Sequence, residues 1–387
     1  MFSIAASHIL LPVAALSLAL SRRPARFPPF LAPLAIFCGW TLLSALLADD
    51  PREAWGDVRK FYVWFLVPGV VYGTVRTVDR ARALMLTIGA GAALSSMWAL
   101  VQFVRKYRAI AVRGEDFYEG YVAARITGFT SHWMTFSGEM VVGLSIVTAF
   151  LLFGQPRGKW RAAAAAMAAA AAMALAIATA LALAWTRSMW AAAAVSLAYL
   201  IWNWRPRFLL VLPVAAGLAI VAAPAPIASR IESIWKPSAR DSNDHRYWLR
   251  QTGARIVAAH PLVGIGPRHV KKKFFEYVPP AAPKPWPVEW YYQHLHNTYL
   301  HWAAERGLPA LFALLWMLTR ILLDLTRAAK CETNPARLFV LHAAIASTIG
   351  LAAGGWWEVN LGDSEVLGAF LAAVSCGYAT REGESNG

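Results

Sequence analysis

Long apolar segments recur along almost the whole chain, and they constrain its fold more than any other feature. They lie at residues 3–20, 30–48, 61–75, 83–104, 133–153, 162–185, 188–204, 207–223, 308–326, 338–355 and 362–379. An α-helix needs about 20 apolar residues to cross the hydrocarbon core of a bilayer. The sequence therefore predicts an all-α polytopic membrane protein with about 11–12 transmembrane helices, the twelfth arising if the first segment is broken at Pro12.

The charge of the chain is strongly positive, at +15 over 387 residues, of which 58% are hydrophobic. The basic residues are scattered among the apolar segments, which argues against a nucleic-acid partner because such proteins gather them on one face of a domain. Part of this excess of Lys and Arg over Asp and Glu suits an anionic substrate. The three cysteines lie in or near apolar segments and imply no disulfide framework. The first segment lacks a basic leader, so we expect a retained membrane segment rather than a signal peptide.

Lys and Arg gather in every second short link between the apolar segments. These groups are Arg22, Arg23 and Arg26; Arg76, Arg80 and Arg82; Arg157, Lys159 and Arg161; Arg205 and Arg207; Arg320, Arg327, Lys330 and Arg337; and Arg381. Cytoplasmic loops carry such an excess, so the alternation predicts that residues 224–307 lie outside the cytoplasm; the basic link 105–125 is an exception to it. We divide the chain into an N-terminal transmembrane bundle (1–223), a large helical periplasmic loop carrying the active site (224–307) and C-terminal transmembrane helices (308–387).

A histidine-rich segment ends that loop and leads directly into the next apolar run. His294, His296 and His301 lie within the segment YYQHLHNTYLHWAAERGLPALF, which spans residues 291–312. We expect a polar helix at the membrane boundary, where a lipid-linked substrate presents its head and histidine can exchange protons near neutral pH. The alternative is that each histidine simply lies at an interface. No His-Glu-x-x-His motif and no P-loop occur, so we predict no metal and no nucleotide cofactor.

Two arginines are candidates for contact with an anionic substrate. Arg187 lies between two apolar segments that nearly touch, where an arginine is costly and a functional role is the default hypothesis; the alternative is that it reaches to the interface. Arg246 opens an amphipathic helix, with pairing to Asp241 or Asp244 as the alternative. The loop 224–307 holds twelve Lys or Arg against six Asp or Glu, which favours a phosphate-bearing partner.

The residues from His296 to Ala310 read HNTYLHWAAERGLPA, and those from Ala259 to Pro267 read AHPLVGIGP. Both resemble motifs of the O-antigen ligase and polymerase superfamily of bacterial envelope glycosyltransferases, although Ala310 replaces a second glycine, a change that should affect packing rather than chemistry. The TRS element at 186–188 resembles a family element at the outer end of a span. GFTSHW at 128–133 and RYW at 246–248 match more loosely.

The resemblance implies a GT-C-like enzyme of the bacterial inner membrane with its active site facing the periplasm. It would transfer O-antigen polysaccharide from undecaprenyl pyrophosphate to a sugar hydroxyl of lipid A–core, without a metal or nucleotide cofactor. His296 is the predicted general base, on one helical face with Tyr299, Leu300 and Ala303. Catalytic and substrate-binding residues predicted beside it are Arg187, Arg246, Arg268, Asn297, Tyr299, His294 and Trp290.

Alternative functions remain open at this point. An O-antigen polymerase or a protein O-oligosaccharyltransferase of the same superfamily would carry the same motifs. A flippase or transporter of polyprenyl-linked glycans would use the basic cavity without a catalytic base, and a membrane scaffold would use neither. We prefer the ligase because the external loop is single and modest in size and because the chain is strongly basic.

Overall fold

The computed structural model describes residues 4–20, 26–155, 158–210, 217, 242–282, 284 and 294–381. Regular structure in these ranges is entirely helical, which confirms the predicted all-α membrane fold. The helices that match predicted apolar segments are α1 (Ile4–Leu20), α2 (Leu31–Leu46), α4 (Phe61–Thr74), α5 (Val78–Arg113), α7 (Trp133–Phe153), α8 (Trp160–Leu183), α9 (Arg187–Trp204), α15 (Leu308–Cys331), α16 (Pro335–Gly354) and α17 (Ser364–Arg381). Within these ranges, α5, α7, α8, α15 and α16 are long and apolar enough to cross a membrane.

Two expectations about the segments need qualification. The segment 207–223 lies mostly outside the described residues, apart from the short helix η1 (Pro206–Leu210). The span predicted at 83–104 continues as α5 to Arg113, because no proline interrupts it and Gly114, at φ 65°, supplies the left-handed residue that ends a helix. The link 105–125 is therefore largely helical, and it ends in the short helix α6 (Phe117–Ala123).

The centre of the bundle is built from α7 and α16, which pack against each other and against α9 and α17. Small residues allow the close approach of α7 and α16: a Cβ on Gly350 of α16 would lie 2.8 Å from Cγ1 of Val141 on α7. The alanine-rich run 162–172 of α8 behaves differently. Only Ala170 of this run is buried, and the partly buried Ala163, Ala166 and Met167 lie on the same helical face, so the run packs through one face while the other is exposed.

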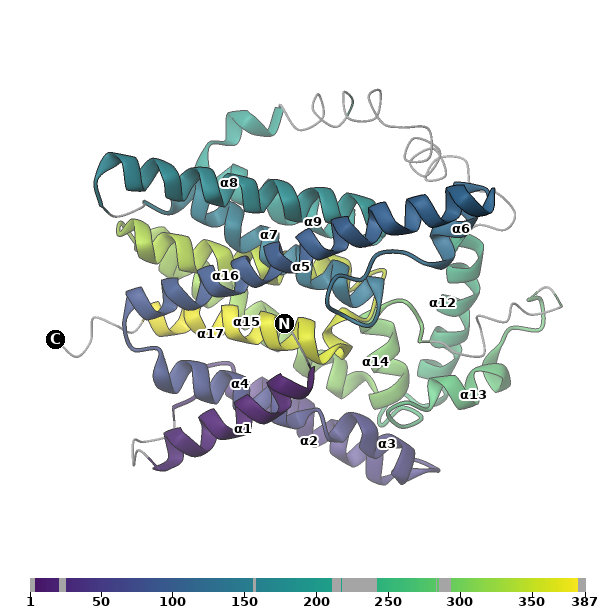
Figure 1. Cartoon of the computed structure of the whole chain (residues 1–387). Helices are drawn as coiled ribbons and strands as arrows, with labels where there is room; N and C mark the ends of the chain where they lie inside the picture. The colour runs from purple at the N-terminus through teal and green to yellow at the C-terminus, as the bar shows by residue number, and fades with distance from the viewer. Residues whose placement is uncertain are drawn as a thin grey trace.

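The helices that contain most of the polar residues gather at one end of the bundle. In Figure 1, α3 (Pro51–Val58), α6, α12 (Ser242–Ala259), α13 (Val270–Tyr277) and α14 (Thr298–Arg306) lie at the right, whereas the C-terminus lies at the left. Lys272 of α13 forms an ion pair with Asp50 at 2.8 Å, and Lys273 pairs with Asp49. These contacts tie the segment after α2 to α13.

Candidate active site

The helix α14 begins after His296, later than the histidine pattern suggested. Oδ1 of Asn297 accepts a hydrogen bond from the backbone N–H of Leu300 at 2.9 Å, which caps the helix and makes Thr298 its first residue. His296 therefore precedes the helix, in a left-handed backbone conformation with φ 45°. The prediction that His296 shares a helical face with Tyr299 is wrong, because the asparagine cap places the histidine in a loop.

The start of α14 is fixed to the segment that follows α16. The Thr298 N–H donates to the carbonyl oxygen of Gly355 at 2.7 Å, and its hydroxyl donates to that of Glu358 at 2.7 Å. Nδ2 of Asn297 donates to the carbonyl of Trp356 at 3.0 Å. These bonds bring Glu358 beside the histidine loop although the two are far apart in sequence.

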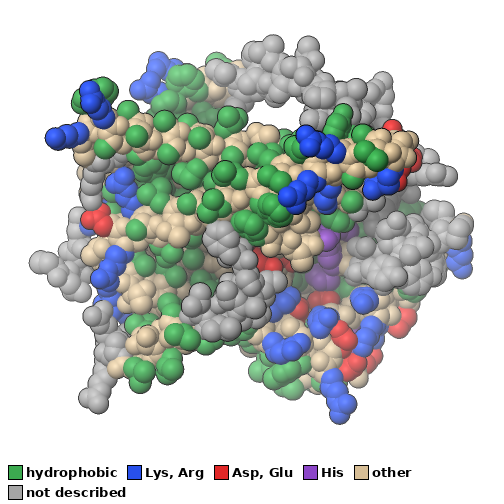
Figure 2. Space-filling model, in the orientation of Figure 1, with side chains coloured by type: hydrophobic (Ala, Val, Ile, Leu, Met, Phe, Trp, Pro, Cys, Tyr) green, Lys and Arg blue, Asp and Glu red, His purple; other side chains and the backbone are tan. Residues whose placement is uncertain are grey.

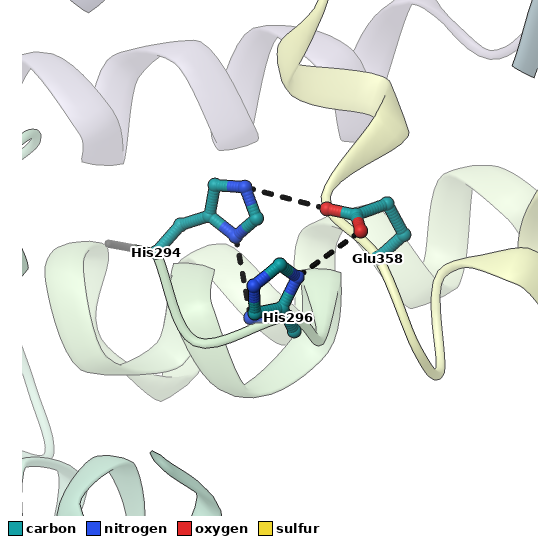
Figure 3. Close-up of side chains that lie close together, drawn as sticks. All are labelled: His294, His296 and Glu358. Carbon is teal, nitrogen blue, oxygen red and sulfur yellow. Dashed lines mark hydrogen bonds and ion pairs between the residues drawn. The ribbon is translucent and has the colours of Figure 1, made fainter. Parts of the chain in front are cut away.

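Glu358 faces two imidazoles: it is hydrogen-bonded to His296 and lies within ion-pair distance of His294 (Figure 3). Its Oε2 lies 3.1 Å from Nδ1 of His296, and its Oε1 lies 3.3 Å from Nε2 of His294. The backbone N–H of His296 donates in turn to Nδ1 of His294 at 3.3 Å. The carboxylate side chain is 3% exposed, the His296 side chain 16% and the His294 side chain 40%, so the group opens outward on the His294 side.

The hydrogen bonds assign the tautomers of both rings. An ionised carboxylate only accepts, so in the neutral form of His296 the proton lies on Nδ1 and the lone pair on Nε2. Nδ1 of His294 accepts, so its Nε2 is the protonated atom that faces Glu358. Burial by itself would raise the pKa of Glu358, but the positive charge that the two imidazoles carry when protonated, together with the hydrogen bond from His296, outweighs it and holds that pKa well below its usual range. Burial lowers the pKa of His294, which keeps its ring neutral.

Arg246 and His132 act electrostatically on the same group. The charge of Arg246, on α12, helps to lower the pKa of His294. Burial lowers the pKa of His132, which caps α7, and the Glu358 carboxylate raises it in part. A Cβ on Gly253 would come within 2.6 Å of Leu295, so α12 lies directly against the histidine loop. The structure thus brings Arg246 to the site and adds His132, which we had quoted only as part of a weak motif.

Arg187 is the first residue of α9, and contacts on either side of it connect that helix end to the site. Oγ of Ser137 on α7 donates to Oγ1 of Thr186 at 3.2 Å. Nδ2 of Asn360, two residues after Glu358, donates to Sδ of Met189 at 2.9 Å. The residue before this turn, Trp185, is buried with φ 52°. A strained bend therefore aims the start of α9 at the segment that carries Glu358.

The remaining predicted substrate-binding residues have other places. Arg268 is exposed, with its Nε 3.4 Å from Oε1 of Glu53, and it lies against Gly56 on α3. The hydroxyl of Tyr299 donates to the carbonyl of Ala352 on α16 at 2.6 Å, so its polar atom holds α14 in place. Trp290 lies outside the described residues.

The two family-like motifs meet at the C-terminal end of α14. The N–H groups of Ile265 and Gly266 donate to the carbonyls of Ala304 and Glu305 at 3.0 and 2.9 Å. Gly264, at φ 65°, lies so close that a Cβ there would stand 2.3 Å from the carbonyl carbon of Glu305. The 259–267 run therefore caps the helix and positions it, which explains its glycines.

Beneath α14 lies a buried layer of charge. Nη2 of Arg306 is 2.6 Å from Oδ2 of Asp57 on α3, and its guanidinium stacks over Trp302 at 4.8 Å. Nε2 of His301 lies 3.5 Å from Oε2 of Glu305. Burial raises the pKa of Glu305 and lowers that of His301, so both groups tend toward their neutral forms.

Seen from outside, histidine side chains reach the surface at the polar end of the bundle, with Lys and Arg on both sides of them (Figure 2). Positive charge around an opening raises the local concentration of anionic ligands. The end of the membrane helices thus combines an oriented imidazole, a buried carboxylate and nearby guanidinium groups.

Comparison with protein families finds a match that includes most of the residues described above. A family model described as O-antigen ligase matches residues 171–315. The matched segment includes Arg187, Arg246 and His296 but ends well before Glu358. This match confirms the resemblance to the O-antigen ligase superfamily. No curated protein matches the chain.

Proposed function

We propose, for a chain that belongs to the O-antigen ligase superfamily through residues 171–315, that it joins a lipid-linked polysaccharide to a sugar acceptor. The donor would be O-antigen on undecaprenyl pyrophosphate and the acceptor a hydroxyl of lipid A–core, at the periplasmic face of the bacterial inner membrane. The observation that carries the proposal is the His296–Glu358 pair at one end of the membrane helices. A polyprenyl chain would lie among those helices while its diphosphate reached this end.

His296 would act as the general base. A sugar hydroxyl is a poor nucleophile, and a positioned base contributes about 10²–10⁴-fold. Since Glu358 accepts from Nδ1, Nε2 is the atom that takes the hydroxyl proton. The acceptor oxygen then bonds to the anomeric carbon of the donor, and the bond from that carbon to the diphosphate oxygen breaks with its electron pair on the leaving undecaprenyl diphosphate. A single displacement of this kind inverts the anomeric centre.

The other charged groups would stabilise the charges that develop during transfer. Glu358 would stabilise the imidazolium that forms as His296 accepts the proton, because the two groups are 3.1 Å apart and nearly buried. Arg187 and Arg246 would bind the diphosphate and stabilise the negative charge that grows on it as the bond breaks. The energy for transfer lies in the diphosphate linkage, so this chemistry calls for no nucleotide.

Transfer in a purified system tests the proposal. Wild-type protein in detergent should shift a lipid A–core acceptor on a gel when supplied with undecaprenyl-diphosphate-linked glycan. His296→Ala should abolish this shift while a labelled polyprenyl diphosphate still binds, because the arginines remain. His301→Ala is the matched control and should cost much less, because its ring faces Glu305 rather than Glu358. Transfer by His296→Ala within about tenfold of wild type would refute the base assignment.

Acceptor choice separates the ligase from its relatives. A polymerase would extend a second lipid-linked glycan, and a protein O-oligosaccharyltransferase would label a protein hydroxyl, each with the lipid A–core left unmodified. A flippase would move the donor across the membrane of a vesicle without breaking the diphosphate bond. Running these acceptors side by side with one donor preparation identifies the activity.

A further inference from the structure

The three side chains at the centre of the site also meet the requirements for a metal ligand set. Within the described parts of the chain, His294, His296 and Glu358 are the group whose ligand atoms all lie within 4.8 Å of one another. Both imidazoles direct a ring nitrogen at the same carboxylate (Figure 3). The loop before α14 and the segment after α16 supply them, and the hydrogen bonds of Asn297 and Thr298 hold these two segments together.

The geometry suits a tetrahedral ion of the zinc type. Zinc lies about 2.0–2.2 Å from nitrogen and oxygen ligands, which gives separations of about 3.3–3.5 Å between ligands. The observed separations are 3.1 Å from Oε2 of Glu358 to Nδ1 of His296 and 3.3 Å from its other oxygen, Oε1, to Nε2 of His294. Two histidines and one glutamate form a known set of three zinc ligands that leaves a fourth position open. Small outward movements of the half-exposed His294 ring are enough to admit the ion.

We propose that His294, His296 and Glu358 bind a zinc-like divalent ion, and that the bound ion switches the transferase off. The inhibitory part rests on the proposed function; the binding part does not. The ion would be Zn²⁺, Co²⁺ or Ni²⁺, since imidazole nitrogen suits these metals, whereas Mg²⁺ and Ca²⁺ favour sites built from oxygen.

Inhibition follows from the tautomer that a metal imposes. In the metal-free network Nδ1 of His296 is protonated and Nε2 holds the lone pair that receives the acceptor proton. A metal on Nδ1 needs the lone pair there, so the single ring proton moves to Nε2. The base nitrogen is then occupied, and the carboxylate that would stabilise the imidazolium is bound to the ion.

Metal binding also has a cost that limits its affinity. When Nε2 of His294 binds the ion, its Nδ1 carries the proton and can no longer accept the N–H of His296, which it does at 3.3 Å in this structure. That contact is long for a hydrogen bond, and the His294 ring is 40% exposed and able to turn away. We therefore expect reversible binding that responds to the free metal concentration rather than a permanent structural site.

Two measurements test the proposal with the full-length protein in detergent. Titration calorimetry of EDTA-treated protein with Zn²⁺ should show one site, and His294→Asn and Glu358→Gln should each weaken it by about tenfold or more. Glu332→Gln, a change at the loop between α15 and α16, is the matched control and should bind Zn²⁺ as wild type does. The visible spectrum of Co²⁺ added to wild type reports tetrahedral nitrogen and oxygen ligands without relying on a variant.

Transfer assays complete the test. Zn²⁺ at ten times its Kd should lower the rate about tenfold, since only the unoccupied fraction works, and EDTA should restore it; Mg²⁺ should have no such effect. Equal Zn²⁺ affinity in wild type and Glu358→Gln, or a six-coordinate Co²⁺ spectrum, would overturn the site. Site-specific binding with an unchanged or faster rate would overturn the inhibition. Absence of transfer under every condition would count against the proposed function alone, because binding is measured separately.

Discussion

Replacing Glu358 by glutamine removes the charge from the site while keeping the shape of the side chain. The carboxylate accepts a hydrogen bond from His296 at 3.1 Å and lies 3.3 Å from Nε2 of His294, and its side chain is 3% exposed. A glutamine presents one oxygen and one NH₂, so one imidazole must now face a donor. If that imidazole is His296, its Nδ1 becomes the acceptor and its proton moves to Nε2, the nitrogen proposed as the base. If it is His294, the bond from the His296 N–H is lost instead.

The expected loss is one charge-assisted hydrogen bond at the moment the imidazolium forms. Such bonds contribute about 1.5–3 kcal/mol, which corresponds to a fall in kcat of about 10–150-fold at roughly 1.4 kcal/mol per tenfold change. The KM for the lipid-linked donor should stay near its wild-type value, because Arg187 and Arg246 are untouched. Glu358→Asp keeps the charge but shortens the side chain by one methylene, so its kcat should lie between that of wild type and that of Glu358→Gln.

Initial rates of transfer at varied donor concentration separate these effects. Glu332→Gln, a similar change far from the histidine loop, should match wild type and thus control for the loss of a negative charge as such. Circular dichroism and thermal melting should first show that each variant is folded. A folded Glu358→Gln with kcat within threefold of wild type would refute the orienting role, and a raised KM with normal kcat would make Glu358 a substrate contact.

Three further predictions address binding, topology and pH. Arg187→Ala and Arg246→Ala should each weaken binding of a labelled polyprenyl diphosphate by about 10–150-fold, because each removes one charge-assisted contact. Arg187→Lys and Arg246→Lys should restore binding only in part. Normal binding by the alanine variants would mean that these arginines act only in the transition state or on the acceptor. In a cysteine-free chain, single cysteines at 236, 272 and 284 should react with an impermeant thiol reagent in spheroplasts while those at 158 and 330 should not, and the reverse would invert the topology. Burial raises the pKa of Glu305, so its protonated form favours the fold below the ordinary carboxyl pKa and that contribution is lost as pH rises toward neutrality. Glu305→Gln should therefore melt higher relative to wild type at pH 8 than at pH 5, and a constant difference would mean that Glu305 does not titrate there.

The membrane helices could be predicted closely from sequence because their signal is local. A run of apolar residues long enough to cross a bilayer has few alternative structures, and nearly every predicted segment appears as a helix. The predictions failed where the local sequence carries no signal for the feature in question. The charges at Arg105 and Lys106 end the apolar segment but not the helix, because no proline or glycine follows until Gly114 stops α5. The alanine run of α8 gives no sign of which face packs: in the structure Ala163, Ala166, Met167 and Ala170 are partly or fully buried, and the other residues of 162–172 are exposed.

The residues of the candidate site could be chosen from sequence more readily than their geometry. Histidine and arginine are rare in apolar surroundings, so His296 and Arg187 stand out in the sequence. The backbone conformation at His296 does not stand out, because a single side-chain cap decides whether His296 lies on α14 or before it. The Asn297 side chain that accepts from Leu300 was readable as a helix N-cap, since asparagine is among the preferred residues there. We gave the histidine periodicity more weight than the cap, and the periodicity was misleading.

Glu358 was missed for a different reason: it lies far in sequence from His296, the base that it would orient. It follows the apolar segment 338–355, at the end that the alternation of basic links puts outside the cytoplasm, so an acid at that position was a usable signal. What sequence could not supply is its partner, because the bonds from Thr298 and Asn297 that bring it to His296 join segments about 60 residues apart. The family match ends at residue 315 and leaves Glu358 outside. The tautomer of the proposed base is thus fixed by a residue beyond the matched segment, and any change in how the end of α16 docks on α14 should alter the base without altering the motif that contains it.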